Sequence, residues 1–332
     1  MISFRYHIVS IVSVFLALAV GVALGGGPLR GEVDNTLVEQ VEADRRAKAD
    51  LRAQINALAA GNAFSDDFAA SVAPEVVSGS LDGRSVTLLV LPGAEESVIA
   101  STTEQIEAAG GSVGGTIRAG EGLTDVSNKQ LVDELGSQLL DGVNDVSVPD
   151  QAGTYERLGA LLARAVATDE DGGAGVDDAA NSILSGLSTA DLMSPAGELT
   201  RRGSLVLVVG GPGSDDSATR EGTGAVVTAL VDAMDQATDG VVVAGPIAAA
   251  RNGGVVDAVR REVVTAREVS TVDTLDRVAG HVVAVLALAE QAQGGAGHYG
   301  SVDAADGVMP GGAAGEETED AGGEEADDGT GG

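Results

Sequence analysis

The hydrophobic pattern at the start of the chain predicts a membrane anchor. Residues 8–24 read IVSIVSVFLALAVGVAL, which is 17 residues without a charge. A helix of that length lies at the short end of what crosses the hydrocarbon core of a bilayer. Arg5 precedes the segment, the next charge is Arg30, and a basic residue before a span favours an N-terminus inside the cell. We therefore expect residues 1–30 to cross the cell membrane once, with the bulk of the protein on the extracytoplasmic side.

Two other interpretations fit the same segment. The small residues of Ala23-Leu24-Gly25 suit the cleavage site of a signal peptide, and cleavage there would still export everything from residue 31 onward. A buried core helix is the third interpretation, but the segment lies at the N-terminus and has no polar face. We favour the retained span.

After Gly25-Gly26-Gly27-Pro28, the pattern predicts a helical stalk over residues 31–63. Residues 32–58 contain no Pro or Gly, and their apolar positions recur every three or four residues with one gap, as in a helix with one apolar stripe. These positions are Val33, Leu37, Val41, Leu51, Ile55 and Leu58.

The gap in the stripe holds two charged residues, Asp44 and Lys48. Charges are costly in the seam of a self-paired coiled coil, but they can meet opposite charges on a different protein. We therefore expect a protein partner to bind the stalk at Leu37, Val41, Leu51 and Ile55. A solvated connector helix and a homo-oligomer are the alternatives.

From about residue 80 to 300 the pattern changes to that of an α/β domain. Continuous apolar runs at 85–91 (SVTLLVL), 204–209 (SLVLVV) and 240–244 (GVVVA) suit strands buried on both faces. A shorter extended piece follows at 112–118. Helical patterns separate the strands, at about 95–109, 128–140, 155–167, 219–236, 254–264 and 281–293. This alternation predicts a parallel sheet covered by helices on both faces.

Residues 301–332 contain ten acidic residues and no basic ones, with many Gly and Ala. Such a segment cannot bury an apolar core, so we expect a disordered acidic tail.

The charge balance narrows the classes of partner. The chain has 51 acidic and 19 basic residues, a formal net charge of -32, which repels nucleic acid. It has no cysteine, which excludes disulfides, thiolate metal sites and cysteine nucleophiles. We therefore expect no nucleic-acid partner and no cysteine chemistry.

Little in the sequence indicates catalysis. The histidines are His7, His281 and His298, and no G-x-S-x-G motif accompanies them. The loop Gly210-Gly211-Pro212-Gly213-Ser214 follows a predicted strand, but Asp215 and Asp216 come next and would repel a phosphate. We interpret it as a tight loop, and we expect neither an enzyme nor a bound cofactor.

Copper(I) prefers clustered Cys or Met ligands, but the four methionines are scattered: Met1, Met193, Met234 and Met309. The sequence therefore predicts no tight copper site, and it assigns no residue as a metal ligand.

Five segments together resemble the actinobacterial copper transporter family of MctB-like proteins. They are the N-terminal run SFRYHIVSIVSVFLALAVGVALG, the following helix, the strand SVTLLVL with its Pro-Gly, the segment STVDTLD (270–276) and the motif GGAGHYG (294–300), which contains His298 and Tyr299. The resemblance implies copper efflux or copper homeostasis in the cell envelope. It also implies a second association, with a membrane partner protein in cell separation and the control of peptidoglycan hydrolases.

A single helical span cannot enclose a pore. A channel role would therefore need several copies or another protein, whereas a stalk with an α/β head suits a scaffold or sensor.

Overall fold

The structure is a computed structural model and describes residues 4–25, 29–143, 145–149 and 151–311. The chain divides into two compact units, Met1–Ser65 and Asp66–Gly332.

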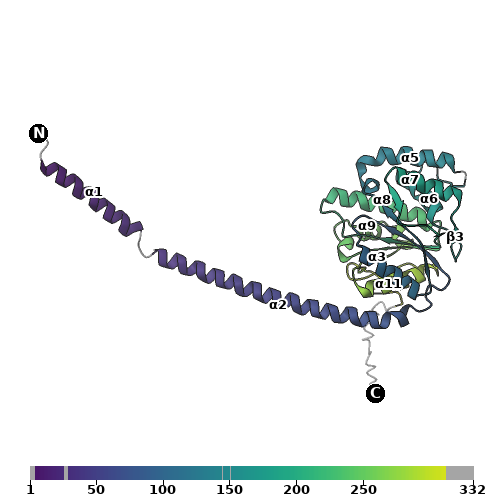
Figure 1. Cartoon of the computed structure of the whole chain (residues 1–332), viewed down its shortest axis with the longest axis horizontal. Helices are drawn as coiled ribbons and strands as arrows, with labels where there is room; N and C mark the ends of the chain where they lie inside the picture. Colours follow the sequence, from purple (N-terminus) through teal and green to yellow (C-terminus); the bar gives the residue numbers. More distant parts are fainter. Residues whose placement is uncertain (1–3, 26–28, 144, 150, 312–332) are drawn as a thin grey trace, which may run out of the picture. The chain divides into compact units, whose positions relative to one another are not determined.

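The first unit is helical (Figure 1). Helix α1, Phe4–Gly25, carries the predicted apolar segment, and all its described side chains are exposed. Its 22 residues span about 33 Å at 1.5 Å per residue, which matches the thickness of a bilayer core. Within the described ranges, it is the one helix that is long and apolar enough to cross a membrane.

Helix α2, Leu29–Val77, begins in the first unit and ends in the second. The sequence predicted a stalk that ends at residue 63, but the helix continues for 14 residues beyond that point. Its last turns are amphipathic: Ala73 and Val77 are buried in the core of the second unit. Pro74 lies in these turns, where its missing N–H removes only one helical hydrogen bond.

The second unit is a head built on a seven-stranded sheet with the order β4-β2-β1-β6-β7-β8-β9. Five of the six neighbouring pairs are parallel, as the sequence predicted, whereas β4 pairs antiparallel with β2. The strands are β1 Ser85–Val90, β2 Ser112–Ala119, β4 Met193–Pro195, β6 Leu205–Val209, β7 Val241–Ala244, β8 Ser270–Val272 and β9 His298–Tyr299. A separate antiparallel pair joins β3 Ala174–Gly175 to β5 Arg201–Arg202.

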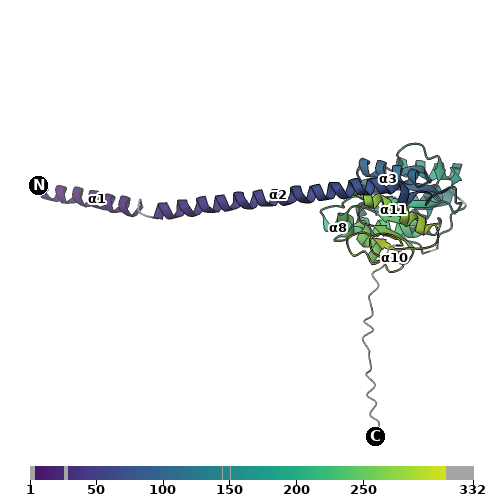
Figure 2. The same ribbon diagram turned by 90° about the horizontal axis from the view of Figure 1, so that it is seen from below.

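Helices cover both faces of the sheet, as predicted (Figure 1). Helices α3, Glu96–Ala108, and α11, Val278–Gln291, pack side by side on one face (Figure 2). The other face carries α5 Lys129–Gly142, α6 Thr154–Val166, α7 Asp178–Thr189, α8 Ser217–Asp235 and α9 Val255–Arg261. Shorter helices complete the order: α4 Glu121–Thr124, η1 Val126–Asn128, η2 Ile247–Ala250 and α10 Thr265–Glu268.

The alternating burial of the strands explains why both faces are covered. Leu88 and Leu207 point into the core under α3 and α11, while Leu89 and Val208 point into the core under α6 and α8. All residues of β1, β6 and β7 are buried, as expected for central strands of a two-sided parallel sheet.

The head continues past the predicted start of the tail. Ser301 and Val302 donate backbone hydrogen bonds to Asp273, at 2.7 and 2.9 Å. A boundary at residue 301 was therefore too early, because the described chain remains bonded to the head beyond it. The rest of the predicted tail, 312–332, lies outside the described residues.

Candidate functional site

The predicted partner surface on the stalk is apolar and open to solvent. Val41, Leu51 and Ile55 are 48%, 57% and 62% exposed. The fourth predicted residue, Leu37, lies on the same helix, but its side chain is outside the described set. Phe64 and Phe68, which the sequence analysis did not single out, are also exposed on α2.

The family motif at residues 294–300 forms the edge of the sheet through β9. Tyr299 is buried, and its hydroxyl donates to Glu290 Oε2 at 2.6 Å. His298 Nδ1 lies 3.0 Å from Thr271 Oγ1. Through this contact His298 links the edge strand β9 to its neighbour β8.

Glycines in the same motif are required by close packing. Gly300 has φ +133°, and a Cβ there would lie 2.1 Å from Asp273 Oδ1. A Cβ on Gly297 would lie 2.2 Å from the hydroxyl oxygen of Tyr299. Side chains at these positions would displace the groups that hold β9 in place.

Asp273 is the centre of this arrangement, which sequence reasoning did not identify. It is fully buried, accepts the backbone N–H groups of Ser301 and Val302, and pairs with Arg260 at 3.0 Å. Arg260 also donates to Thr271 Oγ1 at 2.8 Å and to the Tyr299 carbonyl at 2.9 Å. We call these hydrogen-bonded residues the C-terminal clasp, which consists of Arg260, Asp273, His298, Tyr299 and Ser301.

The loop 210–214 connects β6 to α8 and is a tight loop, as predicted. The carboxylate of Asp216 caps α8 by accepting the Thr219 N–H at 2.8 Å, so an acid already occupies the place where a phosphate would bind. A Cβ on Gly211 would lie 2.4 Å from the carbonyl carbon of Gly93, which shows that the loops after β1 and β6 touch.

These two loops mark the topological switch point of the sheet. The chain proceeds outward from β1 to β2 in one direction, and from β6 through β7 and β8 in the other. In open α/β sheets, ligands bind outside the carboxyl ends of the strands at this point.

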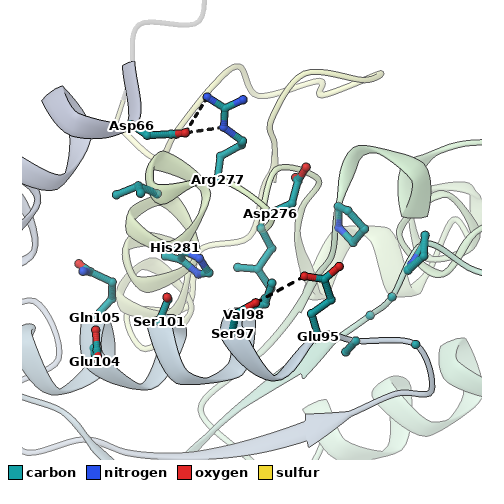
Figure 3. Close-up of a pocket in the computed structure, with 18 of the residues that line it drawn as sticks. Asp66, Glu95, Ser97, Val98, Ser101, Glu104, Gln105, Asp276, Arg277 and His281 are labelled. Carbon is teal, nitrogen blue, oxygen red and sulfur yellow. Dashed lines mark hydrogen bonds and ion pairs between the residues drawn. The ribbon is translucent and has the colours of Figure 1, made fainter. Parts of the chain in front are cut away.

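A cavity of about 570 Å³ opens here between α3, α11 and the last part of α2 that belongs to the head (Figure 3). We call it the switch-point pocket. Its floor contains Gly93, Gly210, Pro246 and Leu275, which follow four successive strands of the sheet.

His281 lines the switch-point pocket and is only 6% exposed. Its Nδ1 lies 2.9 Å from Thr102 Oγ1, and the Thr102 hydroxyl donates its one proton to the Val98 carbonyl at 2.7 Å. His281 must therefore donate from Nδ1, which leaves Nε2 as an acceptor. Burial lowers the pKa of His281 to about 4, so the ring is neutral near pH 7.

The rim of the same pocket is acidic. Glu95, Glu104 and Asp276 line it and are exposed. Asp66, on α2, also lines it and forms an ion pair with Arg277 at 2.9 Å (Figure 3). Among the residues that the structure describes, no three His, Cys, Asp or Glu side chains gather in a metal-binding geometry.

Comparison with known proteins extends over nearly the whole chain. Residues 1–310 match the family described as "Copper transport outer membrane protein, MctB". A relative named "Copper transporter MctB" from Mycobacterium tuberculosis strain H37Rv is 29% identical over 316 residues, covering 91% of this chain and 96% of the relative. The protein of the same name from Mycobacterium leprae is 27% identical over 320 residues, covering 90% and 96%. The chain therefore belongs to the MctB family.

Proposed function

We propose that this protein takes part in copper efflux or copper homeostasis as a single-span protein of the cell envelope. Helix α1 anchors it in the membrane with the N-terminus inside, and the head lies outside the cytoplasm. The observation that supports this proposal is the family match over residues 1–310, together with relatives named as copper transporters. The proposal includes no enzymatic step.

The chemistry of the chain limits what it contributes to such a role. One helix cannot enclose a conducting path, so transport would need further copies or a second membrane protein. Copper(I) favours thiolate and thioether ligands. The chain has no Cys, and its Met193 and Met234 are buried in the core of the head. We therefore assign it an accessory role in the transport assembly.

Deletion of the gene tests this role directly. We expect the deletion strain to tolerate less copper and to accumulate more of it, and we expect the full-length gene to restore both properties. Zinc tolerance is the control and should not change. Unchanged copper tolerance and copper content in the deletion strain would refute the copper role.

A scaffold for a partner membrane protein in cell separation is the second candidate function. It is favoured by the exposed apolar side chains on α2, including Leu51 and Ile55, because an apolar stripe left in water is unfavourable unless something covers it. Under this proposal a deletion would disturb cell separation and leave copper tolerance unchanged.

Charged substitutions in the stripe test the scaffold proposal. In the variant Leu37→Glu, Leu51→Glu, Ile55→Glu, we expect loss of the membrane partner from the purified complex, while the head stays folded. The matched control carries three glutamates on the opposite side of the helix, at positions that are exposed alanines: Ala49→Glu, Ala53→Glu and Ala60→Glu. Equal recovery of the partner with both variants would exclude the stripe as its binding surface.

A further inference from the structure

We propose that the switch-point pocket binds a small organic ammonium ion, whose N–H group donates to His281 Nε2 and whose apolar body lies between α3 and α11. This inference concerns a site apart from the stalk stripe and is independent of the copper and scaffold roles.

The first argument is a pair of acceptors in the pocket wall that receive no hydrogen bond from the described residues. His281 is 94% buried, as its exposure is 6%; Thr102 contacts its Nδ1, and its Nε2 is open to the cavity without a hydrogen bond from the described residues. Gln105, also in the wall of this pocket, has a buried Oε1 that lacks a partner within the described part of the chain. Unpaired buried acceptors are costly, so a ligand that supplies donors gains free energy that an acceptor ligand cannot gain.

The second argument is the charge around the pocket. Four carboxylates line it, from Asp66, Glu95, Glu104 and Asp276, against the one guanidinium of Arg277, which gives -4 + 1 = -3. In a chain with net charge -32, this local field attracts cations and repels anions.

The third argument is the size and lining of the cavity. A volume of about 570 Å³ falls in the range of sites for small organic ligands. Apolar groups complete the lining: Val98 lies in the wall, and Pro246 and Leu275 lie in the floor. A bare metal ion fits this site poorly, because His281 Nε2 stands without a second soft ligand among the described residues that line the pocket.

Figure 3 shows how these features converge. His281 projects from α11 toward α3, where Val98 and Ser101 face it, while Asp276 and Glu95 lie at one side and Glu104 at the other. An ammonium group beside His281 would therefore have carboxylates nearby and an apolar wall behind it.

A series of three probes separates these contributions in the full-length protein, kept in detergent micelles. The probes are 2-phenylethylammonium, its trimethylammonium analogue, which keeps the charge but has no N–H, and neutral 2-phenylethanol. We expect saturable binding of the primary ammonium in calorimetric titration, with both analogues weaker by at least about tenfold. Equal binding of either analogue, or no binding of the primary ammonium at millimolar concentration, would overturn the proposal.

Variants locate the binding in this pocket. Glu104 lines it, whereas Glu107, one turn further along α3, is exposed and does not. Glu104→Gln should weaken binding of 2-phenylethylammonium about two- to fivefold, and Glu107→Gln should leave it unchanged. His281→Leu should weaken it at least about tenfold. If Glu104→Gln and Glu107→Gln bind the probe equally, the pocket is not the site; this comparison holds even if His281→Leu fails to fold.

Discussion

Asp273→Asn is the substitution that most directly tests the C-terminal clasp. The carboxylate of Asp273 is fully buried and receives hydrogen bonds from Ser301, Val302 and Arg260. Every one of these partners is a donor. An asparagine of nearly the same shape removes the negative charge and places an NH₂ group against at least one of them.

The magnitude follows from the burial of the ion pair. The side chains of Arg260 and Asp273 are 8% and 0% exposed. Removing one partner of a buried pair leaves the other charge uncompensated and costs about 3–5 kcal/mol. With a urea dependence of about 2–3 kcal/mol/M for a domain of this size, the unfolding midpoint should fall by about 1–2.5 M.

Urea unfolding of the full-length protein measures this change. Tyrosine fluorescence reports on the head through Tyr155 and Tyr299, with Tyr6 on α1 as a constant background. The matched control is Asp306→Asn. Asp306 also accepts one backbone N–H of the motif, from His298 at 2.8 Å, but it is exposed. Its loss should cost about 0.5–1.5 kcal/mol. Equal midpoints for the two variants would refute the assignment of Asp273 as the centre of the clasp.

Three further predictions concern acid stability, copper and the tail. Burial lowers the pKa of His281 from its ordinary value of 6.5 to about 4 in the folded protein. The unfolded chain therefore binds a proton at this residue more readily than the folded protein does. Between pH 6.5 and pH 4 this difference lowers the free energy of unfolding by about 3 kcal/mol. Denaturation series at several pH values should show a smaller loss of stability with falling pH in His281→Gln than in the unsubstituted protein. Competition with a copper(I) chelator should reveal no sub-nanomolar site in the full-length protein, and a stoichiometric, chelator-resistant copper would contradict this. Removal of residues 312–332 should leave the melting temperature unchanged, whereas removal of 301–332 should lower it, since Ser301 and Val302 bond to Asp273.

The central strands could be predicted from the sequence because strands that are buried on both faces consist of apolar residues throughout. Residues 205–209 and 241–244 are uninterrupted apolar runs, and the structure buries all of them. The strands β8 and β9 could not be predicted in this way. They have three and two residues, and Ser270, Thr271 and His298 are polar, so neither periodicity nor hydrophobicity marks them.

The contacts of the sites depend on residues far apart in the chain. The sequence placed His281 at the start of a predicted helix, but the tautomer of its ring is set by Thr102, which is 179 positions away. Asp273 gave no signal because carboxylates are abundant throughout the chain. Its role depends on the fold that brings Arg260 and Ser301 to it. The length of α2 was underestimated because Gly61 and Pro74 are typical of helix ends, whereas here the burial of Ala73 and Val77 continues the helix.

The family assignment and the chemistry of copper together favour an assembly in which this chain and another protein have different roles. Of the two histidines in the head, His298 contacts Thr271 at the edge of the sheet, and His281 keeps one acceptor nitrogen at the wall of a cavity. Since the chain has no Cys, a path for copper(I) through an assembly with this protein requires soft ligands from another protein. What this chain itself offers to such an assembly is the exposed apolar stripe on the stalk, which includes Val41, Leu51 and Ile55.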